Sequence, residues 1–537
     1  MMRIKLLGML MLWALSQIQA QLLTGENVAV TVTESGQVRG FVSGGIFTFK
    51  GIPYGTAERF ATATKPEPWE GVRSSLSYGP VAPLLNPVTA VDDESEFVFD
   101  HDWGYTSEDC LVLNVWSPGL KDGRKRPVMF WIHGGGFTAG SSQELPSYHG
   151  ENLARSGDVV VVSINHRLNV LGFLDLSAYG DAYATSANNS IVDLKLALEW
   201  VQENIENFGG DPGNVTIFGQ SGGGAKVNTL MAMPAAKGLF HKAVNQSGSF
   251  RESMTTKEVS QRIGAETLRQ LEISPAEVDR IREVPFAELA AASGKALKVV
   301  EDQLKADGQS FGIFGLGWGP SVDGTQLPYQ PSSAEALALA KDVPLLIGTV
   351  KNEFMASGRA GLSHASEAEI MTYIENIHGE RAGEYVEAVR TAYPNTKMPS
   401  DLIDVDLMFR PGAVRQANGK ANLTNGAPVY MYLFTWQSPV MDGKYKAMHC
   451  MELPFVFNNI DRCANMTGGG EAAKALAATV SQSWINFART GDPGHEGLPE
   501  WEAYTEDTGA TMMLDLESEV RYHPDSRLLD FNTRSSR

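Results

Sequence analysis

The chain has few cysteines, only Cys110, Cys450 and Cys463 among 537 residues. An odd number allows at most one pair to form within the chain, so the fold cannot depend on a framework of disulfides. Cys450 and Cys463 lie close in sequence and are the expected pair, a possible disulfide. We expect Cys110 to be a buried free thiol.

Positive charge is also scarce. The sequence carries 44 Lys and Arg against 63 Asp and Glu, for a net charge of −19 and a pI near 5.0. An acidic surface disfavours nucleic acids and anionic membranes as partners. It is compatible with steering cationic substrates, but solubility alone also explains it.

No apolar run after the N-terminal stretch is long enough to span a membrane, and there are no repeats. Residues 1–20 are typical of a secretory signal peptide, with Arg3 and Lys5 before an apolar stretch from Leu6 to Leu15 and a small residue, Ala20, at the end. This stretch is too short to span a bilayer. We therefore expect an exported protein, secreted or periplasmic, with no stable membrane anchor, and one domain over residues 21–537.

Four continuous apolar runs indicate buried strands, at residues 127–133, 158–164, 343–348 and 429–435. Between them lie helical patterns, the clearest at 190–208, where apolar residues recur every three or four positions before Gly209. Short β-type runs at 28–49 predict an antiparallel N-terminal region. Strands alternating with helices predict an α/β fold with a mostly parallel sheet covered on both faces. Residues 252–310 and 365–425 suit inserted helical cap regions.

The stretch at 215–224 organises the chain: three apolar or β-branched residues lead into Gly219-Gln-Ser-Gly-Gly223, and a helix-compatible stretch follows. This pattern is typical of a nucleophile elbow, in which Ser221 sits on a sharp turn between strand and helix. Side chains at 219 and 223 would collide where strand and helix cross. Alone, the pattern also fits a Gly-rich turn with an ordinary serine.

Three glycines follow the buried strand that ends at His133. Their backbone N–H groups can face an open cavity, as an oxyanion hole requires. Gly135, Gly136 and Gly222 are the expected donors, and we expect His133 to orient the backbone of the hole. The alternative is a simple glycine turn.

Two acids compete for the role of orienting a catalytic histidine. Glu353 follows the end of the buried strand at 343–348, where active residues of parallel sheets lie. Asp323 stands in a Ser-Val-Asp-Gly turn, where an aspartate usually bonds local backbone. We therefore favour Glu353, with Asp323 as the rival.

His449 is the expected general base. It follows a buried strand by one loop and precedes the apolar segment 453–457, which can hold it in place. The other histidines after Glu353 fall in or beside helical stretches or in polar loops, and these are His364, His378, His495 and His523. His449 would take the proton of Ser221 and return it to the leaving alcohol, while Glu353 stabilises the imidazolium.

The chain resembles the type-B carboxylesterase/lipase family, the cholinesterase-like α/β-hydrolases, over nearly all of its length after the leader. The motifs that carry the resemblance are Phe49-Lys-Gly-Ile-Pro-Tyr54, Glu108-Asp-Cys-Leu-Val-Leu-Asn-Val115, Trp131-Ile-His-Gly-Gly-Gly-Phe137, Phe208-Gly-Gly-Asp-Pro212, the elbow, Gly348 to Glu353, and His449 to Phe457. The resemblance implies an α/β-hydrolase fold, with Ser221, Glu353 and His449 as catalytic triad.

Two departures stand at the elbow. The family usually has Glu where Gln220 stands and Ala where Gly222 stands, so this chain lacks a negative charge beside Ser221 and a methyl group after it. By analogy with the acyl pocket of the family, candidates for the substrate pocket are Phe311, Phe314, Leu316 and Phe409. Their alternative role is that of ordinary core residues.

The sequence therefore predicts a serine carboxylesterase that hydrolyses a small-molecule ester through an acyl-enzyme, with no cofactor and no metal. Two alternatives remain open: a non-catalytic cholinesterase-like binding protein, and an amidase or lipase with the same triad. The first would have lost catalytic residues, and here each is present.

Overall fold

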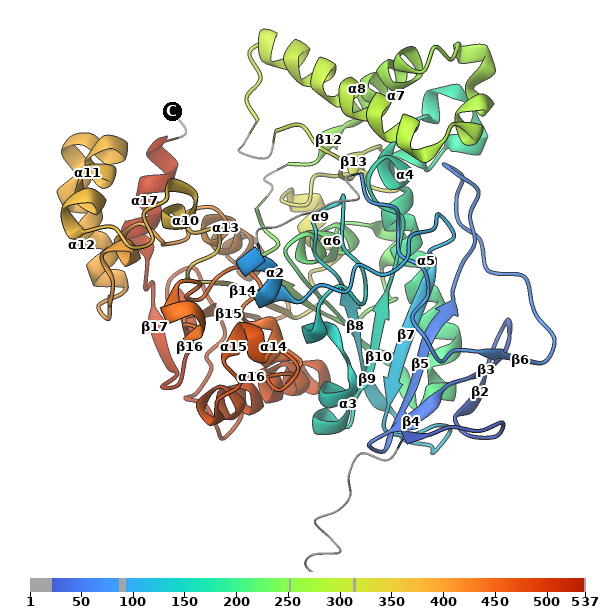
Figure 1. The fold of residues 1–537 in the computed structure, drawn as a ribbon, viewed down its shortest axis with the longest axis horizontal. Helices are drawn as coiled ribbons and strands as arrows, with labels where there is room; N and C mark the ends of the chain where they lie inside the picture. The colour runs from blue at the N-terminus through green and yellow to red at the C-terminus, as the bar shows by residue number, and fades with distance from the viewer. Residues whose placement is uncertain (1–21, 86–92, 251–252, 312–314, 536–537) are drawn as a thin grey trace, which may run out of the picture.

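A twelve-stranded sheet runs through the computed structural model, which describes residues 22–85, 93–250, 253–311 and 315–535 (Figure 1). The predicted leader, residues 1–20, lies outside these ranges. In order across the sheet the strands are β1 (Leu22–Leu23), β4 (Phe41–Ser43), β5 (Ile46–Pro53), β7 (Val112–Ser117), β9 (Val160–Ile164), β8 (Arg126–Ile132), β10 (Gly210–Gln220), β11 (Lys242–Gln246), β14 (Leu345–Val350), β15 (Val429–Phe434), β16 (Ala510–Leu514) and β17 (Glu519–Tyr522).

The central strands, from β9 to β16, pair in parallel. The strands at the two margins, β1, β4, β5, β7 and β17, pair antiparallel. The predicted parallel sheet and its antiparallel N-terminal region are both confirmed. Because the central strands run in parallel, their carboxyl ends meet at one edge, and the loops after them can bring distant residues together.

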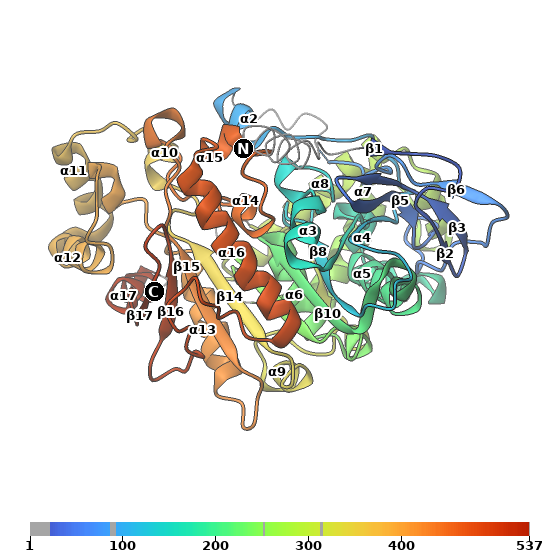
Figure 2. The ribbon, with the colours of Figure 1, turned by 90° about the horizontal axis from the view of Figure 1, so that it is seen from below.

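Successive side chains of a strand point to opposite faces of the sheet, so the strands contribute to two hydrophobic layers. In β8, Phe130 belongs to one apolar cluster, whereas Met129 and Trp131 belong to the other. The first layer contains α5 (Asn189–Asn204), α6 (Gly222–Met231) and α13 (Arg410–Ala421). The second contains α3 (Glu151–Gly157), α14 (Leu453–Val456), α15 (Ala464–Thr467) and α16 (Glu471–Thr490). Figure 2 shows α16 lying across the sheet.

The predicted helix at 190–208 is α5 followed by a 3₁₀ turn, Ile205–Phe208, and Gly209 ends it with φ 78°. The two predicted insertions are also helical: one holds α7 (Lys257–Gln270) and α8 (Phe286–Ala306), the other α11 (Glu367–His378) and α12 (Ala382–Ala392). In Figure 1 these pairs lie at the top and at the left, away from the sheet centre. α13, within the second range, instead packs on the sheet.

Smaller elements complete the fold. They are the three-stranded sheet of β2 (Val30–Thr33), β3 (Gly36–Arg39) and β6 (Val72–Ser74), the pair β12 (Thr255–Thr256) and β13 (Ser321–Val322), and the helices α2 (Asp93–Phe99), α4 (Asn169–Phe173), α9 (Ala334–Leu339), α10 (Ala356–Ala360) and α17 (Ser526–Ser535). Across the ranges that the structure covers, no helix is long and apolar enough to cross a membrane.

The expected disulfide between Cys450 and Cys463 is wrong, because both thiols are free. Sγ of Cys450 points to the elbow, where it donates to Oε1 of Gln220 at 3.3 Å. Cys463 is buried in the second hydrophobic layer. Cys110 is a fully buried free thiol, as predicted, and burial raises the pKa of its thiol.

Candidate active site

The predicted strand, turn and helix around Ser221 are present as β10 and α6. Ser221 has φ 56° and ψ −123°, a strained conformation that exposes its side chain at the turn. The flanking glycines are required sterically. A Cβ on Gly219 would lie 2.7 Å from the carbonyl oxygen of Ile132, and a Cβ on Gly223 would lie 2.0 Å from the same atom. The backbone N–H of Ser221 donates to Gln246 at 2.8 Å, which ties the turn to β11.

Hydrogen bonds to its carbonyls fix the glycine loop after β8. The carbonyl of Gly134 accepts from Nδ1 of His133 at 3.0 Å, and the carbonyl of Gly135 accepts from the N–H of Ala139 at 3.0 Å. In a planar trans peptide the N–H points opposite to the preceding carbonyl. The N–H groups of Gly135 and Gly136 therefore point away from these partners, and within the described ranges they donate to no other group.

The first N–H of α6, that of Gly222, adds a third donor, because helix N-termini leave their N–H groups without intrahelical acceptors. Gly222 packs directly on the glycine loop: a Cβ there would lie 2.1 Å from the carbonyl oxygen of Gly136. His133 is buried and stacks on His166 at 4.9 Å between ring centroids. Burial lowers the pKa of His133, so the ring is neutral and serves as the donor to Gly134.

Glu353 and His449 are hydrogen-bonded to each other, as predicted. Oε2 of Glu353 accepts from Nδ1 of His449, and its other oxygen accepts from Ser247 Oγ at 2.5 Å and from the N–H of Val350 at 3.1 Å. The Glu353 side chain is fully buried. These bonds hold the carboxylate at the carboxyl end of β14, where it orients the imidazole.

Two phenylalanines enclose the imidazole of His449. The ring of Phe354 lies 4.7 Å and that of Phe409 5.1 Å from it, between centroids. Burial alone would lower the pKa of His449, but the charge and hydrogen bond of Glu353 outweigh it, so the pKa is raised above its usual value. Because Nδ1 donates to Glu353, the neutral ring carries its proton on Nδ1, and Nε2 is the nitrogen that can accept another proton.

Nε2 of His449 faces Gln220 in this ligand-free structure. The side-chain amide nitrogen of Gln220 lies 3.2 Å from Nε2, and no hydrogen bond of the described residues joins Ser221 to His449. Catalytic hydrogen bonds in ligand-free sites are often long and tighten only with substrate bound. Gln220 precedes Ser221, so the imidazole already lies beside the turn that carries the serine.

Asp323, the rival acid, lies elsewhere and holds its own turn. Its carboxylate accepts from the N–H groups of Thr325 at 2.8 Å and Leu327 at 3.0 Å and from Asn188 at 2.9 Å. It is an Asx-type turn residue, as the Ser-Val-Asp-Gly sequence indicated. No bond joins it to any of the ten histidines within the described ranges.

The predicted pocket residues divide into two places. Phe409 lies against His449, whereas Phe311 and Leu316 line a cavity of about 490 Å³. Phe250 joins the two, since it lines that cavity and its ring lies 5.3 Å from that of Phe409. Phe314 lies outside the described residues.

Phe250, Phe354 and Lys226 were not predicted. Phe250 follows the carboxyl end of β11 and Phe354 follows Glu353, so their positions after parallel strands were the available signal. Lys226 is a lysine among small and apolar residues, one turn into the helix that begins after Ser221. A charge at such a position on a buried helix is unusual enough to mark it.

Glu452 is a second buried carboxylate near the triad. Its Oε1 accepts from the side-chain amide of Gln246 at 3.1 Å. Burial, and then the charge of Glu353, raise its pKa to about 7. No group of three or more His, Cys, Asp or Glu side chains in the described parts of the chain is arranged to hold a metal ion.

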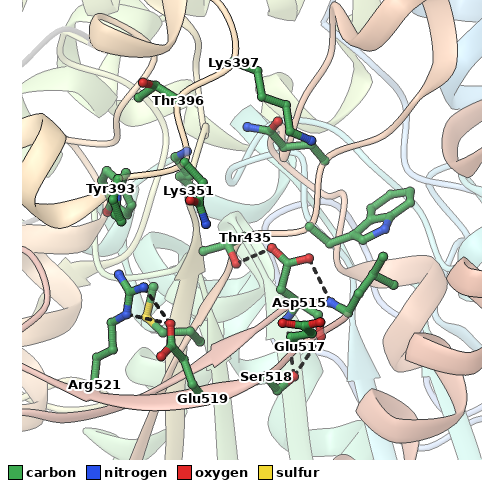
Figure 3. A pocket seen from close by; sticks show the side chains of 16 residues that line it. Lys351, Tyr393, Thr396, Lys397, Thr435, Asp515, Glu517, Ser518, Glu519 and Arg521 are labelled. Atoms are coloured by element: carbon green, nitrogen blue, oxygen red, sulfur yellow. Dashed lines mark hydrogen bonds and ion pairs between the residues drawn. The ribbon is translucent and has the colours of Figure 1, made fainter.

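A larger pocket, of about 990 Å³, lies beyond the ends of β15 and β16, and none of the predicted site residues lines it (Figure 3). Three of its charged groups have partners in its own walls: Asp515 accepts from Thr435 at 2.9 Å, and Glu519 accepts from Arg521 at 2.7 Å. The pocket is thus separate from Ser221, Glu353 and His449.

Comparisons with known proteins agree with this geometry. The model of the carboxylesterase family matches residues 27–532. The para-nitrobenzyl esterase of Bacillus subtilis is 36% identical over 508 residues, 93% of this chain and 97% of that protein. Phenmedipham hydrolase of Pseudarthrobacter oxydans is 33% identical, over 90% of this chain and 94% of that protein.

Solved structures give the same result. An esterase from anaerobic Clostridium hathewayi, described as hydrolysing aliphatic aromatic polyesters, superposes with a TM-score of 0.83 at 38% identity, over 96% of this chain and 99% of that one. A carboxylesterase of Geobacillus stearothermophilus superposes with a TM-score of 0.73 at 37% identity, over 94% of this chain and 99% of that one.

Proposed function

The chain belongs to the carboxylesterase family and is a serine ester hydrolase, and we propose that Ser221, His449 and Glu353 carry out its reaction. Ser221 is the nucleophile, His449 the general base and acid, and Glu353 the acid that orients His449. The N–H groups of Gly135, Gly136 and Gly222 form the oxyanion hole. The observation that carries this assignment is the Glu353–His449 hydrogen bond beside the strained turn of Ser221.

In the acylation step, Nε2 of His449 takes the proton of Ser221 while Oγ attacks the ester carbonyl carbon. The carbonyl oxygen becomes an oxyanion, which the three glycine N–H groups stabilise; one such donor is worth about 3–4 kcal/mol of transition-state energy. The tetrahedral intermediate then breaks its bond to the alcohol oxygen, and His449 returns the proton to that oxygen. Ser221 is left as an acyl ester.

In the deacylation step, a water molecule takes the place of the alcohol. His449 accepts a proton from the water, and the resulting hydroxide attacks the acyl carbon. The bond to Ser221 Oγ breaks, His449 returns the proton to that oxygen, and the carboxylic acid leaves. Throughout, Glu353 stabilises the imidazolium, which agrees with the raised pKa of His449.

The cavity of about 490 Å³ supports an acyl pocket lined by Phe311, Leu316 and Phe250. Phe250 is in contact with Phe409, which lies against His449, so one aromatic series leads from the catalytic imidazole to this cavity. Such a cavity suits an apolar acyl chain of medium size.

Export of the protein is a further part of the proposal. It rests on the basic, apolar and small-residue segments of residues 1–20. N-terminal sequencing of the protein recovered from its native host tests it, since cleavage by a signal peptidase would remove this leader.

A panel of esters and matched amides, varied separately in acyl and alcohol size, tests the substrate class. We expect kcat/KM to be highest for esters with apolar acyl groups of medium length and to be lower by orders of magnitude for the amides. Equal rates on esters and amides, or no ester hydrolysis, would contradict it.

A further inference from the structure

Lys226 is a completely buried lysine beside the glycine loop. Its Nζ donates to the carbonyl oxygens of Gly136 at 2.9 Å and His133 at 3.2 Å, and its side chain has no exposed surface. These two carbonyls flank the segment that holds the N–H groups of Gly135 and Gly136. One side chain thus anchors both ends of the proposed oxyanion loop.

The charge state of Lys226 is unusual. Burial lowers the pKa of its ammonium to about 7, and the charge of Glu144 acts in the opposite direction. No carboxylate of the described residues lies within ion-pair distance of its Nζ. Lys446, which is equally buried, instead has Asp401 and Asp404 at 2.7 Å each.

Burying an amine without a carboxylate partner costs folding free energy, and an apolar residue of similar volume is often neutral or stabilising in such a place. The buried amine of Lys226 therefore lowers the free energy of unfolding, as is expected of a group that serves activity at the expense of stability. The three successive glycines of the loop explain why such a group is needed. A glycine run has more backbone freedom than any other sequence, so it needs fixed contacts to hold one conformation.

Gly222 completes the arrangement. It lies four residues before Lys226, on the same face of α6. The carbonyl of Gly136 occupies the space that a side chain at 222 would fill, since a Cβ there would lie only 2.1 Å from that oxygen. The missing methyl group of Gly222 thus gives this carbonyl its room next to the helix, and Lys226 bonds it there.

We propose that Lys226 is a positioning residue of the esterase: together with Gly222 it holds the carbonyls of His133 and Gly136 so that the N–H groups of the glycine loop stay directed at the oxyanion. This inference rests on the proposed function. Lys226 acts through the loop and does not touch the substrate. Both of its donated bonds survive loss of the charge, because a neutral amine still has two N–H groups.

Lys226→Met tests the proposal, because it keeps the apolar stem and removes the donors. We expect kcat for a small p-nitrophenyl ester to fall roughly 10- to 100-fold, as is typical when a residue that positions catalytic groups is lost. KM should change less than about twofold, because the loop acts mainly in the transition state. The affinity for a trifluoromethyl ketone, which forms an oxyanion on the serine, should fall by the same factor as kcat.

Lys420→Met is the matched control. Lys420 on α13 is also buried and also donates to two backbone carbonyls, those of Ala340 at 2.9 Å and Lys341 at 3.1 Å. These two residues precede the amino end of β14, whereas the candidate active site lies at the carboxyl ends of the strands. Lys420→Met should retain the kcat and the ketone affinity of the wild type. Titration of active sites with a fluorophosphonate gives each kcat per intact site, so partial unfolding cannot imitate the effect.

Gly222→Ala is a second, independent variant. Its methyl group must displace the carbonyl of Gly136 from Lys226, so kcat and ketone affinity should fall, and adding Lys226→Met should cause little further loss. Wild-type kcat and ketone affinity in either single variant would overturn the proposal. Ser221→Ala, measured in parallel, separates the two claims: if it remains active, the proposed function itself fails.

Discussion

The side-chain amide of Gln220 donates to Nε2 of His449 at 3.2 Å, and the thiol of Cys450, the residue after His449, donates to the carbonyl oxygen of the same amide. In the resting enzyme Gln220 thus occupies the imidazole nitrogen that must accept the serine proton. Because an amide carries no charge, it holds the ring without favouring the imidazolium.

Gln220→Glu should therefore change the pH dependence of the reaction. A carboxylate beside the ring adds to the charge of Glu353, which already raises the pKa of the imidazole, and it favours the protonated imidazole. Since the base must be unprotonated, the acid limb of kcat/KM should move to higher pH. A limb at the wild-type pH would show that the contact is absent from the working enzyme.

Glu353→Gln should lower kcat by about 10³- to 10⁴-fold, because an amide cannot stabilise the imidazolium and can select the wrong tautomer. The matched control is Asp323→Asn. It should retain kcat within about twofold, but it should lower the free energy of unfolding by about 1 kcal/mol or more, since Asp323 accepts two hydrogen bonds from its own turn and one from Asn188. Steady-state kinetics and urea unfolding of both variants distinguish the two acids. A larger kcat loss in Asp323→Asn than in Glu353→Gln would make Asp323 the acid that orients His449.

The sequence was sufficient for the elements that local chemistry determines. Buried strands, the helix at 190–208 and the elbow follow from apolar runs, 3.6-residue spacing and glycine sterics, and the structure has each of them. Chain order and strand ends placed Glu353 and His449 together, where they form a hydrogen bond.

The rest depends on contacts between segments far apart in sequence. Closeness in sequence suggested a disulfide between Cys450 and Cys463, but the backbone at Cys450, with φ 74°, directs its thiol to Gln220. The contacts of Lys226 with the glycine loop and of Phe250 with Phe409 join different strand ends. No local pattern encodes such distances, so only the three-dimensional structure reveals them.

Phe250→Ala should change acyl-length preference. Removing the ring opens the space between Phe409 and the cavity of about 490 Å³, so kcat/KM for a long acyl ester relative to a short one should rise about tenfold. Phe531→Ala is the control, since that ring packs on His378 and Tyr385 in a different part of the molecule. It should lower the melting temperature without changing the ratio; an unchanged ratio in Phe250→Ala would exclude this cavity as the acyl pocket.

Lys226→Met should stabilise the fold, and more so at low pH. The pKa of Lys226 is about 7 in the folded protein against 10.5 for a free lysine, so below pH 7 the folded state buries a charge at full cost. Between these values only the unfolded chain binds the proton, and the cost declines as pH rises. Unfolding in urea at pH 6 and pH 10 should give a gain in stability that is larger at pH 6. A gain that grows with pH would contradict the assignment of a buried ammonium.

Ser221→Ala tests whether Ser221 is the nucleophile. Hydrolysis of a short p-nitrophenyl ester is measured per mole of folded protein, and a fluorophosphonate label is located by peptide mapping of the wild type. If Ser221 is the nucleophile, kcat should fall by roughly 10⁴-fold or more, the melting curve should stay almost unchanged, and the label should lie on Ser221 alone. Wild-type hydrolysis in Ser221→Ala, or a label on another residue, would contradict this assignment.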